Sequence, residues 1–325
     1  MRRKIRMSKR VLVTAIGTVT ATAIVRELKK AGCYYIIGAD INKQHEIATS
    51  LDVDEYHVFP YATTDTYVDF AVDFCKEHQV DYYFAVIDKE VVSIAKNRAR
   101  FEEIGTKLCV PDYEFAAACH YKDKFGAWIS ENLPAVAIRE YRGSTEAERA
   151  KYPLFMKPAE GVASAGCRKV ESFKELSASV NLSDIGKDIV LQDYVEGTNI
   201  TVDCVRNRET GEKLQIQRRE LLRNSNGCGI AVEIFEDDRL TAICDTLMEK
   251  LDLNGVCNME FFDTGAGYKI IEINPRFSAG TLYSCMSGAN TVINAIHVAK
   301  KEALEYGKIE IGARFAERYE PYRMA

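Results

Sequence analysis

Short apolar runs alternate with helical patterns over residues 9–110, and few folds accommodate such an alternation. The apolar runs have the length of strands and fall at residues 11–14, 35–38, 82–86 and 107–110. Apolar residues recur at helical spacing between them, at residues 21–30, 67–74 and 90–103. Strands and helices in this order form a parallel sheet covered by helices. We therefore expect an α/β, Rossmann-like unit of about five strands.

The pattern changes after Pro111, where short strands come close together without helices between them. We expect these strands at residues 154–157, 165–170, 189–193, 199–206, 214–219 and 230–235. Two further strands, 256–262 and 268–273, are joined by the glycine-containing turn 264–267. Helices are expected at 122–132, from the N-cap Asp237 to Leu251, and at 290–306. The second part is therefore expected to be an antiparallel α+β region.

Length and charge limit the classes of function. A chain of 325 residues suits two or three domains, since a domain has roughly 100 to 200 residues. The formal net charge is -5, and the pI is about 5.7. Nucleic-acid binding depends on a basic face that neutralises phosphates, so a small-molecule partner is favoured over nucleic acid.

The cysteines and histidines show no motif. The ten cysteines include no CxxC pair, which argues against a zinc knuckle or a redox motif and favours reduced thiols in a cytoplasmic protein. The five histidines stand alone and are interpreted as surface or core residues. The basic start and the apolar run from Val11 superficially resemble a signal peptide, but the run contains several threonines and ends in Arg26-Glu27. It also falls short of the roughly 20 apolar residues of a membrane span, so no membrane partner is expected.

The hairpin at residues 258–276 carries the sharpest chemical signal. Glu272 and Asn274 are two apart in a strand, so their side chains leave the same face. Folding over the short turn brings Glu260 within about one residue of Glu272, although the sequence leaves the register open. Two carboxylates and an amide oxygen then converge, a hard oxygen-only set that suits magnesium. Arg276, just beyond, could meet a phosphoryl oxygen.

The alternative is that each glutamate merely points to solvent from a half-buried sheet, as isolated charged residues mostly do. Convergence with Asn274 and Arg276 favours the metal site over this alternative.

Two weaker signals precede the hairpin. Lys157 ends a strand and is followed by a loop of small residues, 158–166, whose backbone N–H groups can approach phosphates closely. A bland small-residue hairpin is an equal alternative. The strand at 190–193 leads into a turn at Gly197. Polar side chains and unpaired backbone groups at such a strand end can hydrogen-bond to the edge of an adenine. The alternative is that this is a plain strand end without a binding role.

The segment after the first strand is where a dinucleotide fingerprint would stand. Only Gly17 is present, so GxGxxG is absent and a dehydrogenase is disfavoured. Asp88 and Glu90 follow a strand and are candidates to hold an amine. Acids at a helix N-terminus also stabilise the helix, so a structural role is an equal alternative.

Taken in this order, these segments resemble the ATP-grasp superfamily, within it the carbamoyl-phosphate-synthase-like and carboxylate-amine ligase proteins, over nearly the whole chain. The resemblance implies a Rossmann-like pre-ATP-grasp domain at 8–111, a lid subdomain at 112–191 and a catalytic α+β subdomain at 192–325. It implies ATP and Mg²⁺ as cofactors. The N-terminal domain of such proteins lines the substrate side.

The resemblance also implies roles for the matched residues. Asp123-Lys124 opens the lid, and Lys124 and Lys157 contact nucleotide phosphates. The remaining nucleotide contacts are the phosphate loop at 161–166, with Gly161, Ser164 and Gly166, and the adenine hinge of Gln192, Asp193, Tyr194 and Val195. The magnesium ligands are Glu260, Glu272 and Asn274. Basic groups near the transferred phosphate, substrate or acceptor are Arg276, Arg219 and Arg223.

Three positions depart from the family pattern. Asn199 stands where a ribose-binding glutamate is usual, and its amide can still hydrogen-bond. Ala165 replaces a frequent arginine, and Cys228 replaces a frequent lysine. These departures concern acceptor contacts and rate more than ATP binding.

The sequence thus predicts a ligase that activates a carboxylate as an acyl phosphate and passes it to an amine or other nucleophile. A bicarbonate-activating enzyme like carbamoyl phosphate synthase is a variant of this function, and a non-catalytic nucleotide-binding regulatory protein is an alternative. The substrates are a small-molecule carboxylate and an amine. A homodimer is the common default among soluble enzymes.

Overall fold

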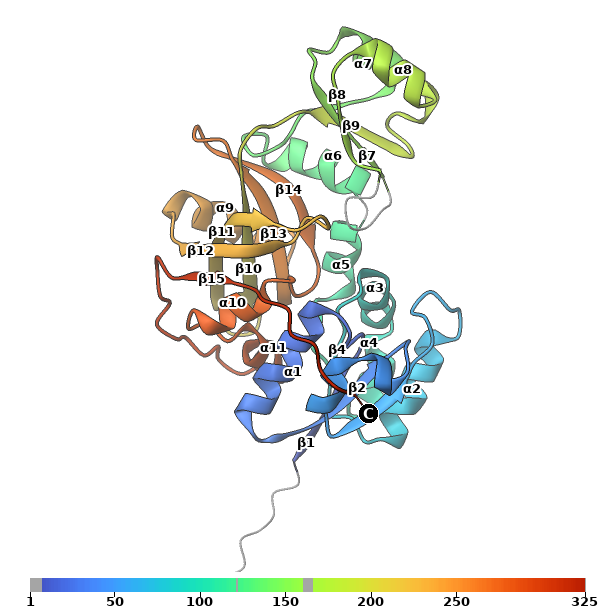
Figure 1. The fold of residues 1–325 in the computed structure, drawn as a ribbon, viewed down its shortest axis with the longest axis vertical. Coiled ribbons are helices and arrows are strands. Elements are labelled where there is room, and N and C mark those ends of the chain that lie inside the picture. Colours follow the sequence, from blue (N-terminus) through green and yellow to red (C-terminus); the bar gives the residue numbers. More distant parts are fainter. Residues whose placement is uncertain (1–7, 121, 160–165, 325) are drawn as a thin grey trace, which may run out of the picture.

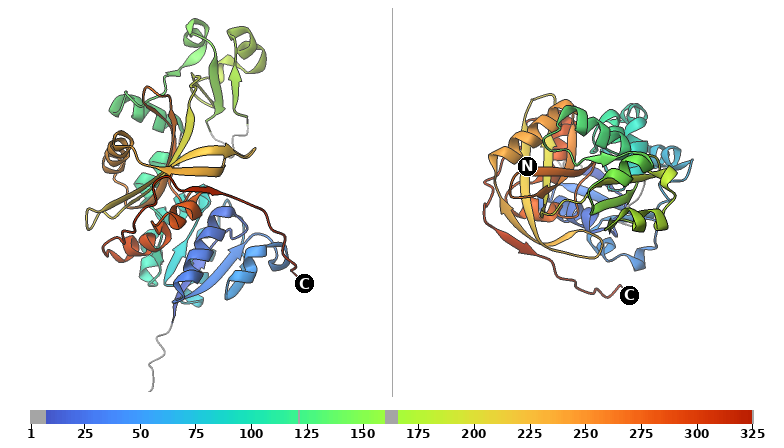
Figure 2. Two further views of the ribbon diagram at one scale, coloured as in Figure 1. Left: turned by 60° about the vertical axis from the view of Figure 1, so that its left-hand side comes forward. Right: turned by 90° about the horizontal axis from the view of Figure 1, so that it is seen from above.

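The computed structural model describes residues 8–120, 122–159 and 166–324. Figure 1 shows three parts: an N-terminal sheet with its helices, a large antiparallel sheet, and a small sheet over residues 140–193, the lid sheet, at the opposite end from the N-terminal part. The left-hand view in Figure 2 shows the lid sheet standing away from the rest of the chain. In the described ranges, no helix combines the length and the apolar character of a membrane span.

The N-terminal part is a five-stranded parallel sheet of order β3-β2-β1-β4-β5, as the alternating pattern predicts. Its strands are β1 (Lys9–Val13), β2 (Tyr34–Asp40), β3 (Glu55–Val58), β4 (Tyr82–Phe84) and β5 (Lys107–Leu108). Its helices are α1 (Val19–Ala31), α2 (Tyr67–Glu77), α3 (Asp88–Lys96) and α4 (Arg98–Glu103). The two faces of this sheet belong to different cores. One face packs within the domain.

The other face shares a core with the large sheet. Val11 of β1 and Ile24 of α1 lie in one cluster with Ile234 and Val292 from the C-terminal part. The link between the two parts is tight at Gly255, whose φ is +138° and where a Cβ would lie 3.0 Å from the Cα of Pro111. Glycine is required at such a close backbone approach. The N-terminal and C-terminal parts are therefore packed as one body.

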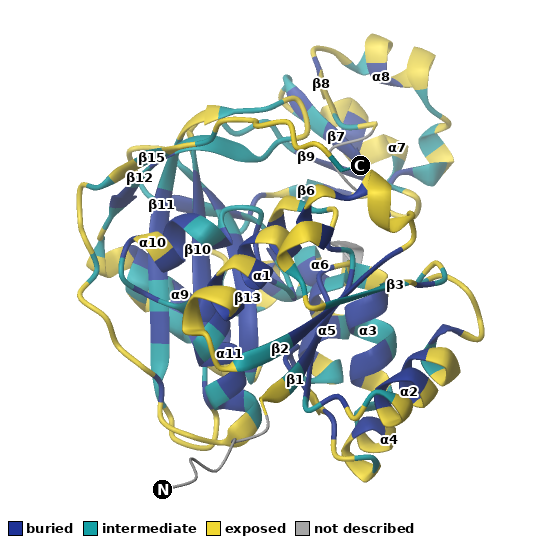
Figure 3. Ribbon diagram, turned by 60° about the horizontal axis from the view of Figure 1, so that its bottom comes forward, coloured by how far each residue is buried: buried dark blue, intermediate teal, exposed yellow. Residues whose placement is uncertain are grey.

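The large sheet has six antiparallel strands in the order β14-β13-β10-β11-β12-β15. They are β10 (Thr198–Arg206), β11 (Lys213–Arg223), β12 (Gly229–Phe235), β13 (Gly255–Asp263), β14 (Tyr268–Asn274) and β15 (Arg314–Ala316). Helix α9 (Asp238–Lys250) packs on one face with α5 (Tyr113–His120) and α6 (Lys122–Asn132). Helices α10 (Thr281–Met286) and α11 (Thr291–Lys300) pack on the other. Figure 3 shows the buried strands between these layers.

The lid is a four-stranded antiparallel sheet of order β6-β9-β7-β8 with a small core of its own. Its strands are β6 (Glu140–Tyr141), β7 (Leu154–Pro158), β8 (Arg168–Val170) and β9 (Ile189–Asp193). Two short helices, α7 (Gly143–Arg149) and α8 (Phe173–Ser179), cover it and are mostly exposed (Figure 3).

Several elements differ from the sequence expectation. Helices α7 and α8 lie between strands where no helix was expected. The helix expected at 90–103 is two helices, because the chain breaks at Asn97, whose side chain donates to the carbonyl of Ser93. The last helix ends at Lys300, since Lys301 adopts a left-handed φ of 60° and ends the helix. In contrast, Asp237 caps α9 as predicted.

Candidate active site

The hairpin of β13 and β14 brings the three predicted metal ligands onto one face of the large sheet. Glu260 pairs directly with Glu272, and Asn258 pairs with Asn274. Paired residues in an antiparallel ladder project to the same side. Nearer the turn, Phe261 pairs with Ile270, so Ile271 is an extra residue and forms a β-bulge. If the pairing continued past Phe261 and Ile270 without a bulge, Ile271 would stand opposite Glu260, and Glu272 would point to the other face of the sheet.

Burial of the apolar side chains of β14 explains this bulge. Tyr268, Ile270 and Ile273 are buried in the core under α9. The spacing from Ile270 to Ile273 is three residues, and an unbroken strand cannot place both on one face. The bulge restores the alternation, and Glu272 and Asn274 are thereby turned to the face away from α9.

Oxygen atoms of this face converge on the amide of Asn274. Its Nδ2 donates to Asn258 Oδ1 at 3.1 Å, to Glu260 Oε1 at 3.2 Å and to Glu272 Oε1 at 3.3 Å. The amide nitrogen therefore occupies a point that three acceptor oxygens surround. Rotation of the amide by half a turn would present its Oδ1 to the same point. The atoms that face this point are then all oxygens, and magnesium prefers oxygen ligands.

Negative charge is crowded at this point. Burial raises the pKa of Glu260 to about 8, and the neighbouring carboxylates of Glu272 and Glu220 add to the rise, while Arg223 and Arg276 oppose it. Burial and the charges of Glu260 and Glu220 also raise the pKa of the Cys228 thiol. A thiol stands beside the carboxylates where the family resemblance would place a lysine. A divalent cation would relieve this crowding, so the residues present fit a magnesium ion.

Arg223 of β11 lies beside the carboxylates of Glu220 and Glu260 on this face of the sheet. Its Nε lies 2.8 Å from Glu220 Oε2, and its Nη2 lies 3.9 Å from Glu260 Oε2. Its Nη1 donates to Asn199 Oδ1 at 2.7 Å. Glu220 in turn accepts from Thr201 Oγ1 at 2.7 Å. The structure therefore brings two of the predicted polar residues, Arg223 and Asn199, into one network with the carboxylates.

Arg276 connects the same face to the N-terminal domain. Its Nε lies 3.0 Å from Asp88 Oδ1 at the start of α3. Its Nη2 donates to Asn274 Oδ1 at 3.4 Å. Arg276 thus links a residue of the convergent set to the N-terminal domain. Asp88, a candidate for holding an amine, is here the partner of an arginine.

Arg219 lies apart from this network. It projects to the α9 side of the sheet, where its guanidinium stacks 4.5 Å from the ring centre of Phe235 and its Nη1 pairs with Glu233 at 3.0 Å. Its neighbour Arg218, which the sequence did not single out, points to the other face. No sequence signal separates the two, because they differ only in strand parity.

Arg218 is almost completely buried and fully engaged. It forms an ion pair with Asp203 and hydrogen bonds with Ser278 at 2.9 Å and with Ser284. Ser284 also donates to Asp203 at 2.7 Å. Asp203 pairs with Asn258 across β10 and β13, so this network lies directly beside the carboxylates. It fixes α10 and the segment before it against the sheet.

The lid sheet and helix α6 carry the remaining predicted residues that can be placed. Lys157 is nearly buried on β7, and Gln192 is buried on β9. Lys124 is exposed in the first turn of α6. Gly166 has a φ of +77°, which favours glycine. Gly161, Ser164 and Ala165 lie outside the described residues, as does the side chain of Asp123.

The hinge after β9 is held by side-chain contacts. Asp193 Oδ1 accepts from the Tyr141 hydroxyl at 2.6 Å, and Lys169 Nζ lies 4.6 Å from the ring centre of Tyr194. A cavity of about 790 Å³ lies beside the hinge, and Asp193 and Val195 line it with residues of α6. Lys157 does not line this cavity, so we do not assign the nucleotide to it.

Glu90 is buried in the N-terminal domain and has a structural role there. It is 1% exposed and its Oε1 accepts from the hydroxyls of Thr14, Tyr67 and Tyr83 at 2.5–2.7 Å. Burial raises its pKa, which these three hydrogen bonds oppose. Of the two acids that are candidates to hold an amine, only Asp88 lies beside the site.

Asp40 accepts a hydrogen bond from the backbone N–H of Gly17 at 2.9 Å in the loop after β1, which stabilises that loop.

Two family models match separate stretches of the chain. Residues 186–319 match a family described as ATP-grasp in the biosynthetic pathway with Ter operon. Residues 11–109 match the PylC-like N-terminal domain. The first stretch contains the convergent carboxylates, and the second contains the parallel sheet.

Relatives share about a quarter of their aligned residues with this chain. The vancomycin B-type resistance protein VanB of Enterococcus faecalis is 24% identical over 237 residues, which are 65% of this chain and 69% of that protein. The carbamoyl phosphate synthase large chain of Clostridium botulinum is 24% identical over 255 residues, 72% of this chain and 21% of that one. The 3-methyl-D-ornithine--L-lysine ligase of Methanosarcina mazei is 24% identical over 131 residues, 40% of this chain and 33% of the ligase. The chain thus spans only part of each relative.

Solved structures share the fold over almost the whole chain. The biotin carboxylase domain of the Hydrogenobacter thermophilus 2-oxoglutarate carboxylase, a dimer in complex with MgADP, ADP and bicarbonate, has a TM-score of 0.75 and 17% identity over 95% of this chain and 74% of its own. N5-carboxyaminoimidazole ribonucleotide synthetase of Thermotoga maritima has a TM-score of 0.66 and 16% identity over 93% of this chain and 78% of its own. At these identities the likeness establishes the fold alone. The α/β and α+β organisation expected from the sequence is confirmed.

Proposed function

We propose that the chain, which matches an ATP-grasp family model over residues 186–319 and the PylC-like N-terminal domain over residues 11–109, is an ATP-grasp ligase that activates a carboxylate as an acyl phosphate and joins it to an amine. The γ-phosphoryl group of ATP moves to a carboxylate oxygen, which releases ADP. The amine nitrogen then attacks the acyl carbon and displaces phosphate, which leaves an amide, ADP and inorganic phosphate.

One observation carries this proposal: Glu260, Glu272, Asn258 and Asn274 direct their oxygen-bearing side chains to one point on the sheet. A solvated sheet face has no need to bury like charges side by side. We assign Glu260, Glu272 and Asn274 as the magnesium ligands. When bound, magnesium would neutralise the charge of the ATP phosphates during phosphoryl transfer.

The lid sheet and helix α6 are together proposed to hold the nucleotide. Lys157 on β7 and Lys124 on α6 are assigned to the phosphates, together with the loop that ends at Gly166. The ammonium group of a lysine is a compact positive charge on a flexible side chain, which suits contact with phosphate oxygens. The hinge residues 192–195 are assigned to the adenine. We correspondingly propose that residues 8–111, 112–191 and 192–325 are the N-terminal, lid and catalytic units, with α5 and α6 of the second unit packed on the large sheet of the third.

The substrate side is proposed to lie between the N-terminal domain and the large sheet. Arg276 is held there by Asp88 and Asn274, and we propose that its guanidinium contacts an anionic group of the substrate. Arg223 balances the acidic face and contacts Asn199, which stands at the position proposed for the ribose. Arg219 is engaged on the other side of the sheet with Glu233, so we give it no catalytic role.

Bicarbonate is the simplest carboxylate to include among the candidate substrates, because a structural neighbour was crystallised with it and a relative is a carbamoyl phosphate synthase. We also propose that the protein forms a homodimer, as that neighbour does. Light scattering of the purified protein tests the dimer: a monomer mass across the working concentration range would overturn it.

Hydroxylamine trapping tests the proposed intermediate directly. Acyl phosphates react with hydroxylamine to give hydroxamates, so incubation with ATP, magnesium, hydroxylamine and a panel of carboxylates should give a hydroxamate for the correct acid. No second substrate is needed in this assay. Formation of ADP from a carboxylate without any hydroxamate would contradict an acyl phosphate.

A further inference from the structure

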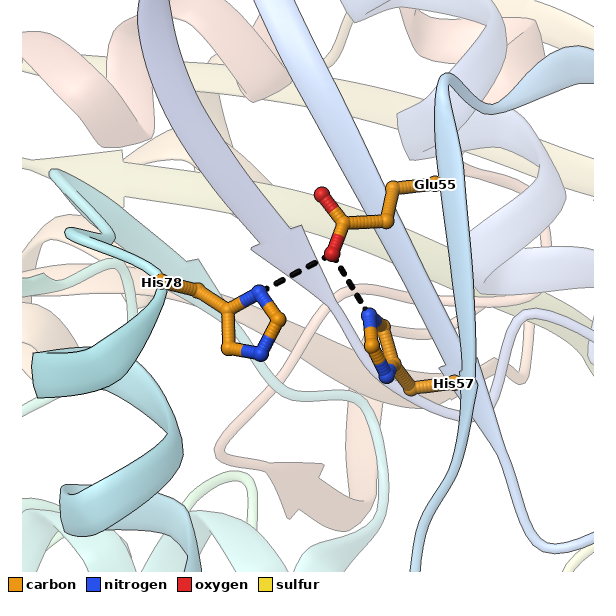
Figure 4. Close-up of side chains that lie close together, drawn as sticks. All are labelled: Glu55, His57 and His78. Atoms are coloured by element: carbon orange, nitrogen blue, oxygen red, sulfur yellow. Dashed lines mark hydrogen bonds and ion pairs between the residues drawn. The ribbon is translucent and has the colours of Figure 1, made fainter.

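A second cluster of ligand-type side chains lies in the N-terminal domain. Glu55 and His57 stand two residues apart on the edge strand β3, so both side chains leave the same face. His78 follows the C-terminal end of α2. Figure 4 shows the three side chains pointing at one another. These two histidines stand far apart in the sequence, and tertiary packing brings them together.

Both imidazoles are directed at one carboxylate oxygen. His57 Nε2 lies 2.6 Å from Glu55 Oε1, and His78 Nδ1 lies 2.9 Å from the same atom. The three ligand atoms all lie within 4.8 Å of one another. A tetrahedral zinc ion with bonds of about 2.0–2.1 Å separates its ligand atoms by roughly 3.4 Å. Small side-chain rotations therefore convert the observed arrangement into a coordination sphere.

Packing and a hydrogen bond hold the three groups in place. The ring of Phe74 stacks on His78 at 4.0 Å and meets His57 edge-on at 4.8 Å. Arg10 Nη2 donates to Glu55 Oε2 at 2.9 Å. This contact occupies the other oxygen and leaves Oε1 toward the imidazoles, as outer-shell partners do in metal sites. The side chains of His57, His78 and Glu55 are 31%, 19% and 24% exposed, which leaves solvent access.

A hydrogen-bonded cluster without metal would also satisfy the carboxylate. Such a cluster has no need for two imidazoles on a single oxygen, because one donor per oxygen suffices and Arg10 already holds the other. Two imidazoles and one carboxylate with access for water form a ligand set that is known to bind zinc. Imidazole ligands favour zinc over magnesium, which prefers oxygen.

We propose that Glu55, His57 and His78 bind one zinc ion, with solvent completing its coordination. The ion would join the edge strand β3 to the end of α2. This site is independent of the proposed ligase chemistry, since it lies on other elements and uses other ligands.

Zinc titration of the full chain tests the site. The protein is first stripped with a chelator, then held in excess magnesium so that the carboxylates of β13 and β14 are filled. Calorimetry should show one zinc equivalent more in the unaltered protein than in His57→Gln or His78→Gln. His45→Gln is the matched control, because His45 is exposed in the same domain and outside the cluster. It should keep that equivalent.

Cobalt substitution separates this site from the ten cysteines. Cobalt at Glu55, His57 and His78 should give d–d absorption without sulfur-to-cobalt charge transfer, and the two histidine variants should lose it. Zinc should also raise the melting temperature of the unaltered protein, a readout that remains if a variant fails to fold. Equal zinc stoichiometry in folded variants and control would overturn the proposal. So would cobalt spectra with thiolate features alone, or an unchanged melting temperature on zinc addition.

Discussion

Glu260 and Glu272 stand directly opposite each other on β13 and β14 because one extra residue, Ile271, shifts the register between them and the turn. Their carboxylates and the amide of Asn274 then share one face of the sheet. The arrangement places two carboxyl groups side by side in a partly buried site, where ionising both of them without a cation is costly. It is unfavourable for the folded chain alone and favourable for binding a cation.

The first prediction concerns the stability of the chain without metal. Glu260→Gln should raise the melting temperature by a few degrees, as expected for roughly 1 kcal/mol, because it removes a carboxylate that burial and Glu272 destabilise. Added magnesium should stabilise the unaltered protein and not the variant. Scanning fluorimetry measures both effects. Asp73→Asn, at an exposed position in the middle of α2, is the control and should change neither.

The same residue predicts a pH dependence. The pKa of Glu260 is raised from 4.5 to about 8. Between these values the folded chain retains a proton that the unfolded chain has released, so the free energy of unfolding should fall as the pH rises through this range. Glu260→Gln should flatten that decline in urea unfolding measured without metal. An equally steep decline in the variant would show that Glu260 is not its source.

The pairing of Arg276 with Asp88 predicts an effect on substrate and not on nucleotide. Asp88→Asn removes the charge that holds Arg276 at 3.0 Å. We expect KM for the carboxylate or the amine to rise about tenfold, the effect of roughly 1.4 kcal/mol, with the affinity for ATP unchanged. Asp73→Asn, exposed on α2, should leave all constants unchanged. Weaker ATP binding in Asp88→Asn would place the pair on the nucleotide side instead.

The buried pair of Arg218 and Asp203 predicts a large loss of stability. Asp203→Ala leaves a buried guanidinium without its carboxylate, which should lower the free energy of unfolding by about 3–5 kcal/mol. Asp52→Ala removes the partner of Lys29 in a pair whose side chains are both more than half exposed, and should change it by less than about 1 kcal/mol. Urea unfolding followed by circular dichroism compares them. Similar losses in both variants would contradict the structural role of the buried pair.

The elements that the sequence predicted well have strong local patterns. β9 has the predicted bounds at residues 189–193, and Asp237 caps α9 as its position before an apolar helix indicated. α10 was not predicted, because its short run of small and polar residues resembles a loop. The last helix was predicted too long, since a left-handed Lys301 has no local signal.

The sequence predicted which residues make up the site, but not how they are arranged in space. The spacing of Glu272 and Asn274 placed them on one face of the strand. The register to Glu260 depended on the bulge at Ile271. This bulge is required because both Ile270 and Ile273 pack against the core, which is a tertiary contact. Arg218 was missed and Arg219 chosen because strand parity at this position follows from tertiary burial. The meeting of His57 with His78 is likewise a tertiary contact without a local pattern.

ADP release in the presence of ATP and magnesium, across a panel of carboxylates paired with amines, tests the central claim most directly when Glu272→Gln is measured beside the unaltered protein. We predict that ADP appears only with a particular acid and acceptor. Glu272→Gln should reduce its rate by at least about 100-fold, since a metal site contributes several kcal/mol to the transition state. An unchanged rate in folded Glu272→Gln, or ATP binding without ADP release for any pair, would contradict the proposed ligase.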